Sequence, residues 1–324
     1  MSLLHFLEEK HFGRLIEQKV LQLASKDKAF AYQWFVHALR SEVSERELIL
    51  CCAFALKWQV VTLEQVQILV NGISLSNDVQ IDVETSALAE GIGDIDKQVL
   101  IDFTSTVGAI INWQGDQECY EDTAQTAETN LPLALFERVR QQIAPQLKDV
   151  TLFGSEGAGS QDQSIRNNSQ FFTPLPNNSL ELAIMERLTA NMVGMPIGFA
   201  EPPVVLRYLP GQYYHWHYDH IYPHNQEIEN QIQQFGQRVK TGILNLNDDF
   251  EGGETEFKLA KLSLKAKTGQ IITFDNADAD GNRLVKSIHR GAEVKSGEKW
   301  IMTLWFRDKP FWLRQGLWGA SASE

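Results

Sequence analysis

The stretch from residue 204 to residue 219 reads VVLRYLPGQYYHWHYD and decides the fold of the C-terminal half. Two β-prone runs, VVLRYL and YYHWHYD, flank the turn-forming pair Pro210-Gly211. Similar runs follow, namely VKTGILNL at 239–246, QIITF at 270–274, LVKSIH at 284–289 and KWIMTLWF at 299–306. No regular helical pattern alternates with them. The sequence therefore predicts an antiparallel sandwich or barrel, and not a parallel α/β sheet.

The first part of the chain has the apolar spacing of amphipathic helices. Apolar residues recur every three or four positions in three runs, at 15–23, 31–38 and 48–56. Ser44, with Glu47 three residues later, predicts a capping box at the start of the third run. The pair Asn71-Gly72 predicts the end of a further helix that starts near residue 62. We therefore expect a small all-α domain of short antiparallel helices.

A polar, acidic connector near residues 74–97 predicts a domain boundary. We place the helical domain at residues 1–95 and a second domain at residues 96–324. Within the first domain, the stretch Ala31–Ala38 weakly resembles one unit of a Sel1-like or tetratricopeptide repeat. Because the sequence shows only one such unit, an ordinary amphipathic helical domain is an equal alternative.

The second domain contains expected helices and two expected polar loops. The helices lie near residues 97–113 and 131–146 and over residues 180–195. Residues 154–179 are rich in Gly, Ser, Asn, Gln and Pro, which is typical of a long loop over an active site. Residues 220–234 are also polar, and we expect them to form a loop that lines a substrate entrance.

The bulk composition limits the classes of function. The 324 residues carry a formal net charge of -13 and are 43% hydrophobic, as in an ordinary globular protein. The excess of acid argues against broad attraction to nucleic acid or to anionic membranes. Cys51, Cys52 and Cys119 form neither a disulfide framework nor a zinc pattern. With no signal-like N-terminus and no stretch of roughly 18 apolar residues, we expect a cytoplasmic protein that binds no membrane.

The triplet His217-Tyr218-Asp219 lies within an expected strand. Residues two apart on a strand point to the same face, so the imidazole and the carboxylate converge. A third ligand from elsewhere in the chain would complete a face of two histidines and one carboxylate. Such a face leaves positions open on an iron(II) ion. On its own, the triplet is equally compatible with a surface strand that carries polar residues.

Four motifs in a fixed order make the pattern specific. They are RYLPGQYYHWHYD at 207–219, QRVKTGILNLNDDFEGGETEF at 237–257, KTGQIITFDN at 267–276 and SIHRGAEVKSGEKWIMTLWFR at 287–307. Together they resemble the catalytic domain of the prolyl 4-hydroxylase family of iron/2-oxoglutarate dioxygenases. The resemblance is strong over about 204–307, weaker over about 100–203 and absent from the helical domain. It implies an α+β chain in which a double-stranded β-helix, or jelly roll, has its core at about residues 203–310.

The resemblance also implies the residues of the site. The iron ligands would be His217, Asp219 and His289. Lys299, ten residues after His289, would bind the distal carboxylate of 2-oxoglutarate, and a buried anionic end needs such a cation. Tyr208, nine residues before His217, would add a hydrogen bond to the cosubstrate. The implied cofactors are Fe(II), 2-oxoglutarate and dioxygen, with ascorbate as an optional reductant.

Several nearby residues have alternative interpretations. Strand alternation places Lys299 and Thr303 on one face, with Asn245 of another strand expected nearby. Many members of the family have a tyrosine where Asn245 stands, so the sequence departs from the family at one wall of the cosubstrate site. His215 lies two residues before His217, so it faces the same side of the expected strand. It has either a supporting or a merely structural role. The stretch Glu251–Glu254 predicts a tight glycine turn, with a calcium site as the alternative.

We therefore expect an iron(II)- and 2-oxoglutarate-dependent dioxygenase that hydroxylates an unactivated C–H bond. The expected target is a proline in a peptide or protein. Another peptidyl residue, a free amino acid or another small molecule is the alternative among enzymes. An interaction protein that binds a protein partner through its helical domain is an alternative of another class, because a shared fold does not fix function. An intact ligand set together with Lys299 argues against that class.

Overall fold

The computed structural model describes residues 22–24, 26–40, 43–72, 96–149, 167–172, 179–265 and 267–311. The chain divides into two compact units. The first holds the described residues up to Trp113 together with Asn130–Pro132, and the second holds the remaining described residues. Among the helices described, none has the length and apolar character that crossing a membrane requires.

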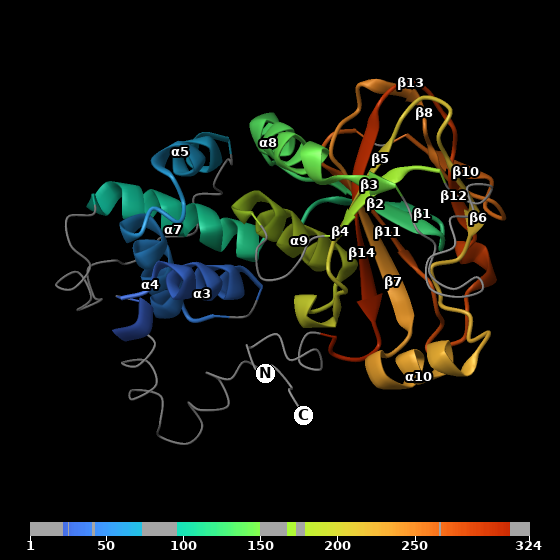
Figure 1. The fold of residues 1–324 in the computed structure, drawn as a ribbon, viewed down its shortest axis with the longest axis horizontal. Coiled ribbons are helices and arrows are strands. Elements are labelled where there is room, and N and C mark those ends of the chain that lie inside the picture. Colours follow the sequence, from blue (N-terminus) through green and yellow to red (C-terminus); the bar gives the residue numbers. More distant parts are fainter. Residues whose placement is uncertain are drawn as a thin grey trace. The chain divides into compact units, whose positions relative to one another are not determined.

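In the described part of the first unit lie the helices α3 (Lys28–Arg40), α4 (Glu45–Lys57), α5 (Leu63–Gly72) and α7 (Lys97–Ile111) (Figure 1). The expected cap of α4 is confirmed, because the Ser44 hydroxyl accepts a hydrogen bond from the N–H of Glu47 at 3.2 Å. Phe35 of α3 and Phe103 of α7 are fully buried, and their ring centroids lie 5.7 Å apart. The helix α7 therefore belongs to the helical core.

The expected domain boundary near residue 95 would place α7 in the second domain, whereas α7 packs with the helices of the first unit. The division of the described residues follows Trp113. The boundary near residue 95 remains a prediction, because residues 73–95 lie outside the described residues. The expected helix at 15–23 also lies outside them, apart from residues 22 and 23. Of the expected loop at 154–179, the structure describes only residues 167–172 and 179.

The second unit is built on an eight-stranded antiparallel sheet, here called the large sheet, in the order β1-β2-β11-β7-β14-β5-β4-β3. Its strands are β1 (Gln117–Tyr120), β2 (Ala124–Glu128), β3 (Lys148–Asp149), β4 (Ser169–Phe172), β5 (Val204–Tyr208), β7 (Arg238–Asn245), β11 (Gln270–Asp275) and β14 (Lys299–Arg307). The small sheet is antiparallel and has the order β10-β9-β12-β6. Its strands are β6 (Tyr214–His217), β9 (Thr255–Phe257), β10 (Leu262–Leu264) and β12 (His289–Gly291). A further pair joins β8 (Phe250–Gly252) to β13 (Val294–Gly297).

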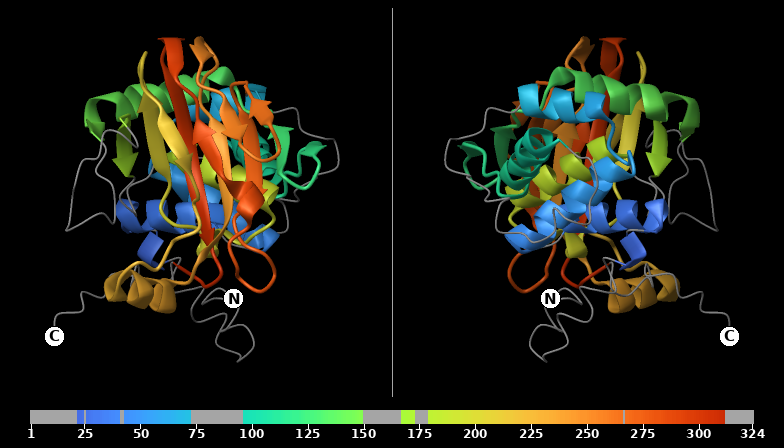
Figure 2. Two further views of the ribbon diagram at one scale, coloured as in Figure 1. Left: turned by 90° about the vertical axis from the view of Figure 1, so that its right-hand side faces the viewer. Right: turned by 90° about the vertical axis from the view of Figure 1, so that its left-hand side faces the viewer.

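A hydrophobic core lies between the large and the small sheet. Leu206, Ile243 and Ile301 from the large sheet share this core with Phe257 and Leu264 from the small one. Two antiparallel sheets that enclose a common core, accompanied by helices, confirm the predicted α+β jelly roll. In Figures 1 and 2 the small sheet lies on the side of the large sheet away from the helices α8 (Leu133–Ile143) and α9 (Leu180–Val193).

The helix α9 packs on the large sheet at β7 and β11. Gly242 of β7 makes this approach possible, because a Cβ atom there would lie 2.5 Å from the Cγ2 atom of Thr189. Ser179 caps α9 by accepting from the N–H of Leu182, and Gly194 ends it with φ +70°. The expected helices at 97–113, 131–146 and 180–195 are thus confirmed as α7, α8 and α9.

Two expectations need correction. The expected loop at 220–234 contains the helix α10 (Gln226–Phe235), which Asn225 caps by accepting a hydrogen bond from the N–H of Ile228. The run LVKSIH is a strand only from His289 onward, because Val285–Ser287 forms the 3-10 turn η4. The Ser287 hydroxyl donates to the carbonyl of Leu284 at 2.8 Å and satisfies a polar group of that turn. The β1–β2 hairpin was not predicted from the sequence.

Candidate active site

The two histidines of the site come from neighbouring strands of the small sheet. His217 is the last residue of β6 and His289 is the first of β12, and the antiparallel register pairs them directly. Their ring centroids lie 4.1 Å apart. Asp219 follows just beyond the end of β6, so it is not within a strand as expected, yet it still faces the histidines. Sequence positions more than seventy residues apart therefore meet at one point.

The three side chains form a compact donor set. Nε2 of His217 lies 3.6 Å from Oδ1 of Asp219, and Nε2 of His289 lies 3.7 Å from Oδ2. One ligand atom from each residue lies within 4.8 Å of the others. Two imidazole nitrogens and a carboxylate are the donor set of the non-haem Fe(II) oxygenases. The residues that the sequence predicted as iron ligands are thus brought together.

Backbone carbonyls fix the direction in which both imidazoles present a lone pair. Nδ1 of His217 lies 2.7 Å from the carbonyl oxygen of His215, and Nδ1 of His289 lies 2.9 Å from that of Ser287. A carbonyl only accepts, so each Nδ1 carries the proton. Each Nε2 is then unprotonated in the neutral ring and faces Asp219, which is the tautomer that binds a metal.

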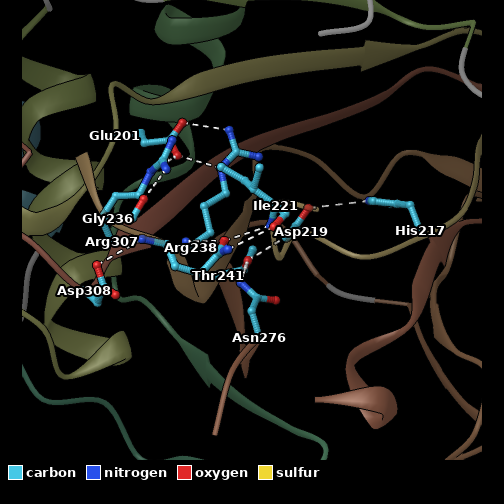
Figure 3. A network of polar contacts seen from close by, with 11 residues as sticks. Glu201, His217, Asp219, Ile221, Gly236, Arg238, Thr241, Asn276, Arg307 and Asp308 are labelled. Atoms are coloured by element: carbon cyan, nitrogen blue, oxygen red, sulfur yellow. Dashed lines mark hydrogen bonds and ion pairs between the residues drawn. The ribbon is translucent and has the colours of Figure 1, made fainter. Parts of the chain in front are cut away.

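Asp219 is held as a buried carboxylate. It is 5% exposed, and its Oδ2 accepts a hydrogen bond from the Thr241 hydroxyl at 2.7 Å (Figure 3). The Thr241 oxygen in turn accepts from Nδ2 of Asn276 at 2.8 Å. Burial by itself raises the pKa of Asp219, but His289, His217 and Arg238 outweigh it and leave the pKa below its usual value. The carboxylate is therefore ionised and available as a ligand.

A pocket between the sheets connects this donor set to Lys299. Its walls include Tyr208 and Leu206 of β5, Ile243 of β7, and Ile301, Thr303 and Trp305 of β14. Strand alternation predicted that Lys299 and Thr303 share one face, and both line the pocket, which confirms the parity. The pocket therefore has an ionic group at Lys299, the donor set at His217, and mostly apolar walls between them.

Lys299 is a buried cation with an incomplete set of partners. It is 3% exposed, and its Nζ atom donates to the carbonyl oxygen of Gly253 at 2.6 Å. In the described part of the chain no carboxylate pairs with it. Burial lowers the pKa of Lys299 to about 8, and Glu254 offsets only part of that effect. An ammonium in this state favours an anion as its further partner.

Tyr208 lies beside this lysine, and its expected hydrogen bond to the cosubstrate stays a prediction. The register of β5 and β14 pairs Tyr208 with Lys299, and Nζ lies 5.6 Å from the centre of the Tyr208 ring. Asn245 is paired with Ile301, which lies two residues before Thr303 and faces the same side of β14. Its Nδ2 donates to the carbonyl of Gln270 at 3.1 Å, so the amide is engaged with β11. The departure from the family at Asn245 therefore changes a side chain that holds two strands together.

The remaining candidates have structural roles. The imidazole of His215 is exposed and accepts from the N–H of Trp216, so its contribution to the site is the backbone carbonyl. Gly252 and Gly253 have φ +71° and +68°, which confirms the predicted glycine turn. In this turn the carbonyl of Gly253 meets Lys299, while the acidic residues around it form no cluster of metal ligands among the described residues.

Sequence reasoning missed a partly buried ionic network beside the pocket. Arg238 makes two hydrogen bonds to Glu201, with Nη2 2.7 Å from Oε2, and Arg307 donates to Glu201 at 2.6 Å (Figure 3). The Arg238 guanidinium lies over the Trp305 ring at 3.9 Å. Burial raises the pKa of Glu201, but Arg238 and Arg307 outweigh it and hold the pKa below its usual value. The network therefore fixes one wall of the pocket.

Comparison with known proteins places the chain in a family. The model of the 2OG-Fe(II) oxygenase superfamily matches residues 203–307. A putative prolyl 4-hydroxylase of Acanthamoeba polyphaga mimivirus is 35% identical over 167 residues, which cover 51% of this chain and 68% of that protein. Prolyl 4-hydroxylase 1 of Arabidopsis thaliana is 33% identical over 166 residues, which cover 47% of this chain and 57% of that protein.

Among solved structures, the viral collagen prolyl hydroxylase of Paramecium Bursaria Chlorella virus-1, in its 2OG complex, matches with a TM-score of 0.44 and 25% identity. The match covers 57% of this chain and 96% of that one. The sequence matches show that the chain belongs to the prolyl 4-hydroxylase-like family of 2OG-Fe(II) oxygenases. It is a 2-oxoglutarate-dependent dioxygenase, and its reaction uses Fe(II), 2-oxoglutarate and dioxygen.

Proposed function

We propose that His217, Asp219 and His289 hold the catalytic Fe(II), that Lys299 and Tyr208 bind 2-oxoglutarate, and that the enzyme hydroxylates a proline within a peptide or protein. The observation that carries the proposal is the orientation of the two imidazoles. Both rings have Nδ1 tied to a backbone carbonyl, and both turn Nε2 towards the Asp219 carboxylate. A structural histidine pair has no need of this shared direction, whereas a metal site requires it.

The donor set fits Fe(II) by its chemistry. Two neutral nitrogens and one anionic oxygen leave several positions on the ion for other ligands. When bound, Fe(II) supplies the coupling of 2-oxoglutarate decarboxylation, which yields succinate and carbon dioxide, to the hydroxylation of an aliphatic C–H bond. Thr241 holds the Asp219 carboxylate with one oxygen directed to each imidazole, and the apolar walls keep water from the reacting groups.

Lys299 suits the distal carboxylate of 2-oxoglutarate. Its ammonium lies in the same pocket as the donor set and has an anion-binding capacity that Gly253 alone does not satisfy. A 2-oxo diacid has one chelating end and one carboxylate end. The pocket offers a donor set and a buried cation in the same arrangement. Tyr208, opposite Lys299, supports the same end of the cosubstrate.

The choice of proline rests on the relatives and on the chemistry of the ring. The relatives that match at 35% and 33% identity bear the name prolyl 4-hydroxylase. Proline presents aliphatic C–H bonds on a ring with fixed φ, which limits the conformations that a site must select. The net charge of -13 favours a peptide or protein substrate over nucleic acid. The helical unit is a candidate site for a protein partner.

The test compares substrates by mass spectrometry. Protein loaded with Fe(II) is incubated with 2-oxoglutarate and, in separate reactions, with proline-containing peptides, free amino acids or a protein extract. The expected result is succinate release coupled to the addition of one oxygen to a peptidyl proline. The double variant His217→Ala/Asp219→Ala, the matched control, should bind no iron tightly and add no oxygen. Oxygen found only on free amino acids would reject the proline assignment and leave the iron site intact.

Two finer points belong to the same proposal. Ascorbate as a reductant is supported by the family resemblance alone, and omission of ascorbate from long reactions tests it. A cytoplasmic location is supported by three free thiols, of which Cys51 and Cys52 are fully buried. Cell fractionation with an antibody to the full chain tests the location.

A further inference from the structure

Asn247 lies between β7 and β8 and contacts the backbone on both sides of Lys299. It is 3% exposed. Its Oδ1 accepts a hydrogen bond from the N–H of Trp300 at 2.7 Å, and its Nδ2 donates to the carbonyl of Glu298 at 2.6 Å. A single carboxamide therefore bridges the residues before and after Lys299.

The orientation of this amide is fixed by its partners. The N–H of Trp300 only donates, so the oxygen of Asn247 must face it, and the carbonyl of Glu298 only accepts, so the nitrogen must face that side. The second hydrogen of Nδ2 is used by Oδ1 of Asp249. Asparagine is the residue whose side chain satisfies this set, because aspartate has no donor for Glu298 and would repel Asp249.

The far end of the Lys299 side chain is held separately. Nζ donates to the carbonyl of Gly253, whose own N–H donates to the carbonyl of Glu293 at 3.0 Å. A Cβ atom at Gly253 would lie 3.2 Å from Cδ of Lys299, so the glycine leaves room for the lysine stem. The ammonium is thus located by the Gly253 carbonyl at its tip and by Asn247 at its backbone.

We propose that Asn247 is a positioning residue for Lys299, and that it sets the affinity and the selectivity of the enzyme for the distal carboxylate of 2-oxoglutarate. The inference rests on the role proposed above for Lys299. A lysine side chain has four rotatable bonds, so a small tilt of its peptide displaces Nζ from the pocket wall. By holding both flanking peptides, Asn247 removes that tilt and keeps the ammonium where an anionic ligand meets it.

The experiment measures binding of two ligands that differ only in the distal group. Calorimetry follows 2-oxoglutarate, and separately 2-oxopentanoate, titrated into Fe(II)-loaded full-length protein without dioxygen. In Asn247→Ala we expect 2-oxoglutarate affinity to fall about tenfold, equivalent to about 1.4 kcal/mol. Affinities for 2-oxopentanoate and for Fe(II) should stay as in the wild type. The same pattern is expected as a higher KM for 2-oxoglutarate with a smaller change in kcat.

The controls separate this role from general damage. Asp248→Ala changes the next residue, whose exposed carboxylate accepts from the N–H of Thr268, so it should leave both affinities unchanged. Asn247→Ser keeps a hydroxyl in place of the amide and is measured if Asn247→Ala fails to fold. Equal loss of both ligands, or unchanged preference for 2-oxoglutarate in a folded variant, would overturn the inference.

A parallel Lys299→Ala titration distinguishes the two proposals. If Lys299→Ala loses the preference for 2-oxoglutarate and the Asn247 variants keep it, only the role of Asn247 is wrong. If Lys299→Ala itself keeps the preference, the assignment of Lys299 is wrong, and the positioning role falls with it.

Discussion

Lys299 and Asp219 are opposite charges that line one pocket, and burial disfavours the charged form of Lys299 but not, on balance, that of Asp219. Burial lowers the pKa of Lys299 to about 8 and raises that of Asp219 before the imidazoles and Arg238 reverse the sign. Both groups are 5% exposed or less. An anion that pairs with the buried Lys299 ammonium therefore recovers free energy that a solvent-exposed lysine would not offer.

We predict that Lys299→Ala weakens 2-oxoglutarate binding by about 2–5 kcal/mol, because a buried carboxylate loses its charge partner. Iron affinity should survive, since Lys299 is no ligand. The protonated lysine is the binding form and its free pKa is about 8. Wild-type affinity for 2-oxoglutarate should therefore be flat below pH 8 and fall by up to tenfold per pH unit above it.

Anaerobic titrations at several pH values check this prediction. Lys240→Ala is the matched control, because Lys240 is partly exposed and pairs with Asp275 outside the pocket. The fall in affinity above pH 8 should be present in the control and absent in Lys299→Ala. A Lys299→Ala enzyme with wild-type affinity, or with the same pH profile, would contradict the prediction.

The sequence predicted which side chains belong to the site better than it predicted the contacts that hold them. His217, Asp219, His289 and Lys299 stand in motifs whose order and spacing survive in the linear sequence. The backbone carbonyls that orient the imidazoles could not be recognised in the sequence, because any residue type supplies a carbonyl. Sequence parity placed Asn245 on the correct face of its strand, but it did not show that the amide binds β11. The alternation of side chains along a strand determines which face a residue occupies, whereas its hydrogen-bond partner depends on how the strands pack.

The strand β7 serves both faces of the large sheet. Thr241 points to Asp219 inside the sandwich, and the next residue, Gly242, admits α9 on the outside. Alternation along one strand therefore couples the placement of a helix to the placement of a ligand-holding hydroxyl. The strand sequence VKTGILNL predicted the alternation, whereas the need for glycine at residue 242 became visible only when α9 was in place.

Thr241→Val tests the contribution of β7 to the metal site. Valine keeps the shape of threonine but removes the donor to Asp219 and leaves Nδ2 of Asn276 without its acceptor. We predict an iron affinity lower by about 10–100-fold, the range for loss of a group that supports a metal ligand. Thr189→Val, the same change on α9, removes only a bond to the Met185 carbonyl and should leave iron binding unchanged. Equal affinities in the two variants would show that Thr241 does not support Asp219.

The elements that the sequence missed share a physical cause. The helix α10 has Ile228, Ile232 and Phe235 at helical spacing and a capping Asn225, but its ten residues are otherwise polar and none is fully buried. The hairpin of β1 and β2 has a largely exposed first strand, so it lacks the apolar alternation that marks a strand. Short, polar elements are stabilised by their neighbours and carry little periodic signal of their own.

Contacts between distant segments were the least predictable feature of the second unit. Glu201 meets Arg238 and Arg307 across 37 and 106 positions in the sequence. No spacing in the local sequence indicates these ion pairs, and each of the three residues, taken alone, would be interpreted as a surface charge. An antiparallel sandwich or barrel was predictable because its strands and turns are local, and the family resemblance specified the jelly roll. The wall that Arg238 and Trp305 form depends instead on the completed fold.

Ligands that bind only the folded second unit should stabilise it. At a free concentration one hundred times its Kd, 2-oxoglutarate added to Fe(II)-loaded protein contributes about 2.7 kcal/mol, which for a domain of this size corresponds to roughly 5–10 °C in Tm. We predict this rise by calorimetry without dioxygen, in the transition of the unit that contains the pocket. If the helical unit unfolds separately, its transition should not move. The variant His217→Ala/Asp219→Ala should show no such rise, because 2-oxoglutarate then lacks the metal that chelates it. An equal rise in that variant would place ligand binding outside the pocket of His217 and Lys299.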